Sequence, residues 1–255
     1  RRSARPSRRT TVGVSAAILE GGPSVALRGA EHFPMQSVYK LPIAMAVADA
    51  ADRLPLDRKI RLTPQDYEPR LHSPIREKHP KGVTLTVAEL LRYSVSESDN
   101  TASDLLLKLL GGPPRVMSYL DRIGVRDIAV LNSEHEINTA GGDRQYRNFA
   151  TPDAAVLLLR KLNQPLLLQY MTQTVTGPRR LKGLLPPGTV VAHKTGTSGT
   201  HDGMTPATND IGLVTLPNGR HIVIAVFVSD ARASEQIREG VIARIAKAVW
   251  DCWSR

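Results

Sequence analysis

Segments with strand-like patterns lie near the two ends of this 255-residue chain, and helix-like patterns fill its middle. Near the start, residues 10–20 alternate β-branched and small side chains, and a Gly-Gly-Pro turn leads into a second short strand at 24–27. An amphipathic helix over 233–250 closes the chain. Three further strands are predicted just before that helix, the last two joined by a Pro-Asn-Gly turn, at 189–193, 211–216 and 221–229.

Strands from both ends of a chain can share one sheet only if the middle is inserted between them. We therefore predict an α/β sheet domain built from residues 1–33 and 181–255, and an all-α domain formed by residues 34–180. Ligand sites often lie in clefts between domains, so we expect the functional site in the cleft between these two.

The predicted helices account for most of the middle segment. The long polar stretch at 54–82 is predicted to be a connection across the surface. The stretch at 128–148 is predicted to be a loop of about 15 to 20 residues, and loops of that length inside compact domains tend to be functional. The helices are expected at 37–52, at two positions between 84 and 112 with a break at 96–100, and at 113–123, 151–162 and 165–175.

The stretch FPMQSVYKLPIA at 33–44 carries the most reactive pattern in the chain. Ser37 and Lys40 are three residues apart, so a helix starting near the serine would hold the hydroxyl and the amine on one face. A desolvated lysine can take the proton of a serine nucleophile. The helix is apolar nearly all round and is expected to be buried. Alone, the pair also fits a capped helix with a solvated lysine.

Three other polar motifs fall where a cleft would need them. The helix break contains Ser98-Asp99-Asn100, which offers a hydroxyl and an amide. A Lys-Thr-Gly-Thr-Ser-Gly run starting at Lys194 ends a predicted strand, and the long loop carries Glu134 and Asn138, which could hold a water molecule.

Composition excludes several other classes of function. The formal net charge is +10, but five arginines among the first nine residues leave only +5 for the rest, and aromatic residues make up 4%. We therefore expect no nucleic-acid partner, and interpret the arginines as a solvated tail or the remnant of a leader. The chain has a single cysteine, Cys252, and its histidines show no metal-ligand spacing, so we expect no metal. No apolar run is long enough to span a membrane.

Taken together, the motifs resemble those of the class A serine β-lactamases. Ser-x-x-Lys, Ser-Asp-Asn and Lys-Thr-Gly occur in the family's order, 61 and 96 residues apart, with Glu-x-x-Ile-Asn between the last two. The resemblance covers nearly the whole chain. It implies the β-lactamase and transpeptidase fold, an antiparallel sheet flanked by helices with a helical domain inserted. It also implies a β-lactam substrate and no cofactor.

The resemblance also implies catalytic roles. Ser37 would be acylated, and Lys40 would activate it directly or through a hydrogen-bond network. Ser98 would relay a proton to the leaving nitrogen, and Glu134 would be the base for the hydrolytic water. Whether Glu134 or Lys40 takes the proton during acylation is disputed for the family.

Substrate-binding roles are implied in the same way. The substrate carboxylate would meet a lysine, two threonines and an extra arginine, and backbone N–H groups of Ser37 and Thr197 would form the oxyanion hole. The acylamido side chain would contact an asparagine in the helix break, and a histidine would flank the cleft. The substrate-binding residues are Asn100, Asn138, Arg180, Lys194, Thr195, Thr197, Ser198 and His72.

Some of these assignments have alternatives. Arg180 follows another arginine and could be a solvated surface charge, and Asn138 could be a turn residue. Glu136 competes with Glu134, which we prefer because only it has an asparagine four residues later.

Departures from the usual family pattern point to the PER-type extended-spectrum branch. The loop has Ile137 where leucine is common, lacks a proline after its glutamate, and contains Gly141-Gly142. A longer connection is expected at 200–208, after the Lys-Thr-Gly strand. Both features would widen the site for oxyimino-cephalosporins.

We therefore expect a monomeric, periplasmic or secreted β-lactamase. The rivals are a penicillin-binding D-Ala-D-Ala carboxypeptidase or transpeptidase, a serine glutaminase, and a β-lactam-sensing receptor domain that stays acylated.

Overall fold

The computed structural model describes residues 9–67, 70–139 and 142–254. Most of the N-terminal arginine run therefore lies outside the described residues. The strands are β1 (Thr11–Ile18), β2 (Ser24–Leu27), β3 (Phe33–Pro34), β4 (Lys59–Leu62), β5 (Val83–Thr86), β6 (Ile128–Ala129), β7 (Phe149–Ala150), β8 (Val191–Thr197), β9 (Thr205–Thr215) and β10 (His221–Ala231).

The helices lie mostly between the second and the eighth of these strands. They are α1 (Lys40–Asp49), α2 (Pro74–Lys78), α3 (Val87–Ser96), α4 (Asn100–Leu110), α5 (Pro113–Arg122), α6 (Glu134–Thr139), α7 (Pro152–Lys161), α8 (Pro165–Thr172) and α9 (Glu235–Trp253), with the 3-10 turns η1 (Gln36–Tyr39), η2 (Pro64–Asp66) and η3 (Gly142–Tyr146).

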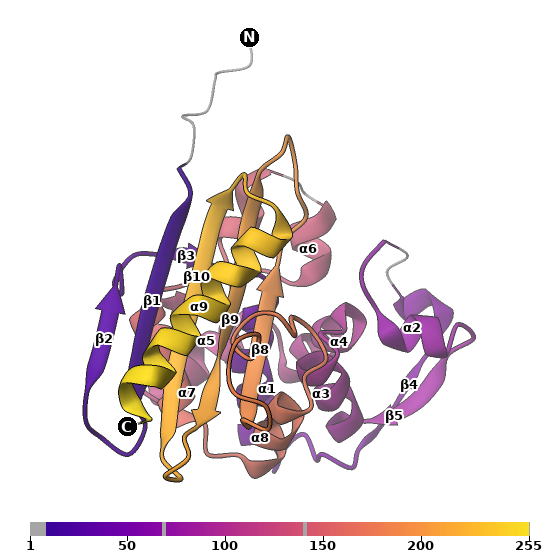
Figure 1. Ribbon diagram of the computed structural model, residues 1–255. Helices are drawn as coiled ribbons and strands as arrows, with labels where there is room; N and C mark the ends of the chain where they lie inside the picture. The colour runs from indigo at the N-terminus through magenta and orange to yellow at the C-terminus, as the bar shows by residue number, and fades with distance from the viewer. Residues whose placement is uncertain (1–8, 68–69, 140–141, 255) are drawn as a thin grey trace.

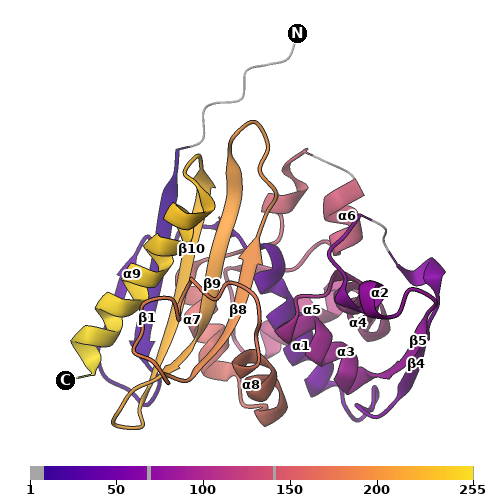
Figure 2. The same ribbon diagram turned by 45° about the vertical axis from the view of Figure 1, so that its right-hand side comes forward.

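The two ends of the chain meet in one five-stranded antiparallel sheet, as the strand pattern predicts. Its order is β2-β1-β10-β9-β8, so the strand with the Lys-Thr-Gly motif lies at one edge. Helix α9 covers one face of the sheet, and the other helices gather on the opposite side (Figures 1 and 2). The fold class predicted from the sequence is confirmed.

Two hydrophobic cores share the sheet between them. On β10, Val223, Ala225 and Phe227 pack into the core formed with the helical cluster, while the alternate residues, such as Val226, pack under α9. Successive side chains of a strand point to opposite faces of the sheet, so a strand that is covered on both faces contributes alternate residues to the two cores. Helix α1, buried from Lys40 to Val47, passes through the helical core.

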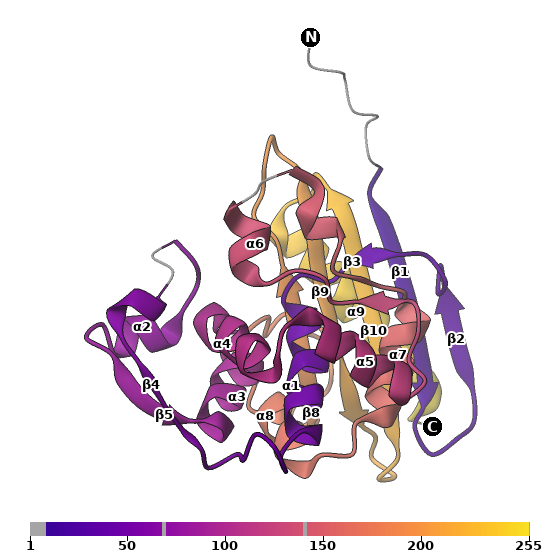
Figure 3. The same ribbon diagram turned by 180° about the vertical axis from the view of Figure 1, so that it is seen from behind.

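Helix α7, which falls within the segment predicted to be all-α, also packs against β1 and β10, as the view from behind shows (Figure 3). One core therefore runs continuously from the helices to the sheet. The two-domain division with boundaries at 33 and 180 stays a prediction.

Three expectations about local structure were wrong. The segment 54–82 is not a plain connection, because it holds β4, which pairs with β5, and α2. The segment 128–148 is not a plain loop, because it contains α6. Strand β9 starts at Thr205, six residues before the predicted strand, so the connection expected at 200–208 is only 198–204.

The shorter connection is a hairpin tip. His201 and Met204 exchange backbone hydrogen bonds of 2.9 Å, and Asp202 and Gly203 between them both have positive φ angles of 50° and 71°. Two consecutive residues with positive φ form the tight turn that matches the twist of paired strands.

Phe227 provides a test of the core between sheet and helices. Its ring is fully buried and stacks on Phe33 with centroids 5.7 Å apart. We expect Phe227→Ala to lower the free energy of unfolding by about 3 to 5 kcal/mol, because it leaves a cavity that the surrounding side chains fill poorly. Urea denaturation followed by circular dichroism measures the change. Ile237→Ala, at a position 55% exposed, is the control and is expected to change stability by less than about 0.5 kcal/mol. Equal losses in both variants would contradict this account.

Candidate active site

The serine motif lies where the chain enters α1. Ser37 belongs to the 3-10 turn η1, and Lys40 is the first residue of the α-helix, so the predicted helix start is a 3-10 turn instead. With three residues per turn, residues three apart still share one face. The turn is held by Asn209, whose Nδ2 donates to the carbonyls of Pro34 (2.8 Å) and Met35 (3.1 Å).

Strand β8 packs directly against this turn. A Cβ atom on Gly196 would lie 2.2 Å from the carbonyl oxygen of Met35 and 3.1 Å from Val38 Cγ2, so only glycine permits the approach. The contact places the backbone of Thr197, the next residue on the edge strand, beside the turn that carries Ser37.

Lys40 is fully buried and binds groups from two other segments. Its ammonium donates to the carbonyl of Ser98 (2.8 Å), in the break between α3 and α4, and to Oδ1 of Asn100, the first residue of α4. It also lies 3.5 Å from Oε1 of Glu134. A buried ammonium needs an opposite charge and hydrogen-bond acceptors, and these contacts provide both.

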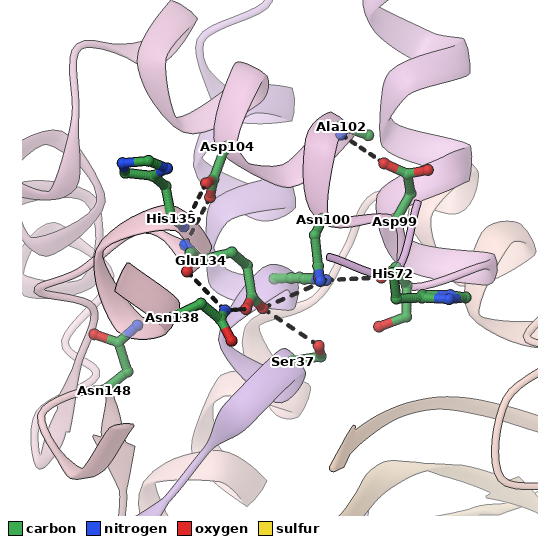
Figure 4. A network of polar contacts seen from close by, with 12 residues as sticks. Ser37, His72, Asp99, Asn100, Ala102, Asp104, Glu134, His135, Asn138 and Asn148 are labelled. Atoms are coloured by element: carbon green, nitrogen blue, oxygen red, sulfur yellow. Dashed lines mark hydrogen bonds and ion pairs between the residues drawn. The ribbon is translucent and has the colours of Figure 1, made fainter. Parts of the chain in front are cut away.

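Glu134 reaches the serine from the first turn of α6. Its Oε1 accepts from Ser37 Oγ at 3.5 Å, and its side chain is 7% exposed. Asn138, one turn later, donates from Nδ2 to the Glu134 carbonyl (2.8 Å) and to Oε2 (3.4 Å). Figure 4 shows these side chains converging on one point between α6 and the serine turn. The competing Glu136 points elsewhere, because its carboxylate accepts from the backbone N–H of Ser133 (2.8 Å).

Asp104, which the sequence reasoning missed, fixes the start of α6. Its two carboxylate oxygens accept the backbone N–H groups of Glu134 (2.8 Å) and His135 (2.9 Å) (Figure 4). Burial, and to a smaller extent the Glu134 charge, raises the pKa of its carboxyl to about 6, against the lowering effect of these two donors. The available signal was its position four residues after Asn100, on the same face of a predicted helix.

The helix break is anchored by a second aspartate. Asp99 caps α4 by accepting from the N–H of Ala102 (2.8 Å), and it also binds the hydroxyl of Ser73 (3.0 Å) and the N–H of Ile75 (2.8 Å). This anchoring keeps Ser98 in a left-handed conformation, with φ of 57°, that a non-glycine residue rarely adopts.

Lys194 approaches Ser98 from the edge strand. Its ammonium donates to Ser98 Oγ (2.9 Å) and to the carbonyl of Thr195 (3.0 Å), and its side chain is fully buried. Burial, followed by the nearby Lys40 charge, lowers the pKa of this lysine well below its usual value.

Arg180 lies behind the same strand and is not a solvated charge. Only 4% of its side chain is exposed, whereas 65% of the side chain of Arg179 is. Its guanidinium donates to Thr197 Oγ1 (2.7 Å) and to Oε1 of Glu239 on α9 (3.1 Å). Thr195 shares a hydrogen bond of 2.6 Å with the hydroxyl of Thr176.

Several of these side chains border one open cavity of about 1040 Å³, whereas Lys40, Lys194 and Arg180 are buried behind its lining. His72 and Ser198 both line it. The histidine ring bonds the Glu97 carbonyl at 3.0 Å, and the Ser198 hydroxyl accepts from the N–H of Ala207 at 2.9 Å. The residues that border the cavity also include Ser37, Ser98, Asn100, Glu134, Asn138, Thr195 and Thr197.

The arrangement combines the parts of a serine acyl-transfer site. The Ser37 hydroxyl contacts the Glu134 carboxylate, which also contacts the Lys40 ammonium, and a second ammonium, that of Lys194, binds the Ser98 hydroxyl. Among the described residues, no three His, Cys, Asp or Glu side chains gather into a possible metal site. In the same part of the chain, no helix is both long and apolar enough to cross a bilayer.

The raised pKa of Asp104 gives a pH-dependent prediction. The folded-state pKa of about 6 exceeds the ordinary 3.8, so the folded protein holds the proton more tightly and the charged form destabilises it. The wild type is therefore expected to lose about 2 to 3 kcal/mol of unfolding free energy, relative to Asp104→Asn, as pH rises from 4 to 7. Urea denaturation at several pH values measures this. Asp121→Asn, at an exposed position on α5, is the control. A difference that stays constant with pH would refute the effect.

Comparisons with known proteins agree with this geometry. The model of the β-lactamase enzyme family matches residues 3–253. β-Lactamase VEB-1 of Pseudomonas aeruginosa is 45% identical over 233 residues, 86% of this chain and 78% of that protein. Extended-spectrum β-lactamase PER-1 of the same species is 41% identical over 232 residues, with coverages of 86% and 75%. The crystal structure of TLA-1 extended-spectrum β-lactamase superposes with a TM-score of 0.93 at 42% identity, over 96% of this chain and 94% of that one. The chain therefore belongs to the β-lactamase enzyme family, in its class A serine branch.

Proposed function

We propose that this β-lactamase hydrolyses penicillins and cephalosporins, oxyimino-cephalosporins included, through an acyl intermediate on Ser37. The observation that carries the proposal is the convergence of Ser37, Lys40 and Glu134. A single carboxylate oxygen of Glu134 lies 3.5 Å from both the serine hydroxyl and the lysine ammonium.

In the acylation step, Ser37 Oγ attacks the lactam carbonyl and its proton passes to a neighbouring base. Glu134 contacts the hydroxyl directly, at 3.5 Å, whereas Lys40 is connected to it through the same carboxylate oxygen, also at 3.5 Å. The backbone N–H groups of Ser37 and Thr197 would bind the developing oxyanion. Support for this pair comes from the close packing of β8 on η1 at Gly196. Loss of one such donor typically costs about 3 kcal/mol in transition-state stabilisation.

As the C–N bond of the lactam breaks, the leaving nitrogen takes a proton from the hydroxyl of Ser98. The proton that left Ser37 passes from the base to Ser98 in its place, so Ser98 is a hydroxyl again and Glu134 is a free carboxylate before deacylation. Lys194 supports this role, because its ammonium donates to Ser98 Oγ at 2.9 Å and so leaves the serine proton free to point toward the substrate. The same ammonium, with the hydroxyls of Thr195 and Thr197, would attract the substrate carboxylate, and buried Arg180 behind Thr197 adds a second positive charge.

In the deacylation step, Glu134 takes a proton from the water that attacks the ester carbonyl. The bond from the acyl carbon to Ser37 Oγ then breaks, and the proton passes from Glu134 to the serine oxygen, 3.5 Å away. Asn138 would share in holding that water, since its amide already contacts the same carboxylate. An enzyme differs from a receptor that stays acylated because it hydrolyses the acyl-serine ester. That hydrolysis needs a general base close to the serine, and Glu134 is a carboxylate in that place.

The acylamido side chain would lie between Asn100 and the edge strand near Ser198, with His72 at the rim. The volume of the cavity, about 1040 Å³, supports the proposal that it can hold a bulky acylamido side chain. Two of the relatives named above carry the description extended-spectrum. The long connection first expected at 200–208 gives no support, since its second half belongs to β9.

We also propose that the enzyme acts as a monomer, in the periplasm or after secretion. Both the monomeric state and the location are proposed from the resemblance alone.

Glu134→Ala tests the separation of the two chemical steps. Removing a general base typically slows its step by about 100-fold to 10,000-fold, so the variant is expected to become acylated on Ser37 and to release the product slowly. Intact-protein mass spectrometry after mixing with a cephalosporin detects the adduct. Glu136→Ala is the matched control on the same helix and is expected to show no lasting adduct. Normal turnover by Glu134→Ala would exclude the proposed base.

The substrate range has a direct test. We expect cefotaxime to be hydrolysed with a kcat/KM within about tenfold of that for cephalothin, because the cavity leaves room beside Asn100 for the larger oxyimino group. Steady-state kinetics with benzylpenicillin, cephalothin and cefotaxime gives the comparison. Hydrolysis of the first two compounds with none of cefotaxime would contradict the extended range and leave the family assignment intact.

A further inference from the structure

A buried amide, that of Asn209, lies in an otherwise apolar layer of β9. The side chains of Ile211 and Leu213, two and four positions further along the strand, pack into the core between the sheet and the helices. Because every second side chain of a strand points to the same face, Asn209 faces this core as well. The residue is fully buried. A polar group in such a place costs free energy unless its hydrogen bonds are made.

All the hydrogen bonds of this amide are made, and two of them go to the serine segment. Nδ2 donates to the carbonyl oxygens of Pro34 (2.8 Å) and Met35 (3.1 Å), and Oδ1 accepts from the N–H of Val228 on β10 (3.3 Å). Carbonyl oxygens only accept and a backbone N–H only donates, so the two ends of the amide cannot be exchanged. The amide therefore fastens the chain just before Ser37 to the sheet.

The bond to Met35 acts on the peptide unit that leads to the nucleophile. A peptide unit is planar, so fixing the Met35 carbonyl also fixes the N–H of Gln36. Only the φ and ψ angles of Gln36 separate this plane from the peptide unit that carries the N–H of Ser37. The φ angle of Gln36 is 48°, in the left-handed region that a non-glycine residue rarely adopts. Such a conformation persists where surrounding contacts hold it, and the Asn209 amide is one of these contacts.

The backbone of Asn209 joins the same turn to the edge strand. Asn209 pairs with Gly196 on β8, the residue whose missing side chain lets that strand approach the Met35 carbonyl. The carbonyl of Asn209 accepts from Nη1 of Arg180 (3.0 Å), and Nη2 of the same guanidinium donates to Thr197. One residue therefore contacts both the serine segment and the arginine assigned to the substrate carboxylate.

We propose that Asn209 is a positioning residue for acylation, because its amide holds the hydroxyl and the N–H of Ser37 in the geometry that attacks the lactam carbonyl and binds the oxyanion. The inference rests on the proposed role of Ser37 as the nucleophile. Asn209 is fully buried, so it acts through the turn and not on the substrate. Misplacing a reacting group by about 1 Å can slow a reaction by about 100-fold, so two hydrogen bonds that fix this turn affect the rate strongly.

Asn209→Leu removes both donors and the acceptor with a side chain of similar size. The carbonyls of Pro34 and Met35 then each lose a donor, and the turn shifts. For nitrocefin, kcat/KM, which includes every step through acylation, is expected to fall by about 100-fold. The affinity for phenylboronic acid is expected to fall by about tenfold or more. Its boron atom takes the serine oxygen as a fourth ligand and becomes a tetrahedral anion, which resembles the transition state of acylation.

Leu213→Ala is the matched control, because it removes apolar packing on the same face of the same strand and no hydrogen bond to the serine turn. It is expected to lower stability and to change kcat/KM and boronic acid affinity by less than about twofold. All measurements are made at a temperature where circular dichroism shows each variant folded. Large losses in Asn209→Leu alone support the proposal. Values within about twofold of the wild type in folded Asn209→Leu, or equal losses in both variants, overturn it.

If Asn209→Leu does not fold, Asn209→Asp provides the test with a side chain of the same shape. Its carboxyl donates one hydrogen bond when neutral and none when ionised. The loss of kcat/KM relative to the wild type is therefore expected to grow as pH rises, and a constant ratio near one would overturn the proposal. A wild type that neither turns over nitrocefin nor binds the boronic acid would contradict the proposed function itself. An active wild type with unaffected variants would contradict only the role of Asn209.

Discussion

The burial of the Lys40 ammonium is the constraint on which the site depends. A positive charge inside a protein is tolerated only when acceptors and an opposite charge surround it. Here the acceptors come from the α3–α4 break and the charge from α6. Satisfying one lysine therefore draws two distant segments toward the serine turn. The catalytic groups are assembled by the same contacts that make the buried charge stable.

A second buried lysine, Lys194, binds the hydroxyl of Ser98, whose carbonyl binds Lys40. Two like charges close together disfavour each other, and the Lys40 charge adds to burial in lowering the pKa of Lys194. Glu134 lies 3.5 Å from the Lys40 ammonium and balances its charge. Asp104 fixes the start of α6 by accepting the backbone N–H of Glu134, although burial disfavours its charged form and raises its pKa.

Where local patterns are strong, they predicted the structure well. The alternating residues near the start of the chain, the apolar run at 221–229 and the apolar run after Lys40 were clear signals, and β1, β10 and α1 lie in these segments, although α1 begins three residues later than predicted. Patterns failed where a distant residue decides the outcome. Helix α6 has six residues, too few for a periodic signal, and its first N–H groups are capped from α4. The start of β9 was missed because Asn209 and Asp210 are polar residues buried by partners on other segments.

By itself, the sequence determined the order and spacing of the three motifs, the sheet built from both ends, and the family, which the comparisons confirm. Only the tertiary structure decided which of two glutamates faces the serine, and that Arg180 is buried while Arg179 is exposed. Only the structure showed that Asp104 binds the first N–H groups of α6. The physical reason is that a side chain's charge, burial and hydrogen-bond partners depend on residues tens to hundreds of positions away, which no local pattern records.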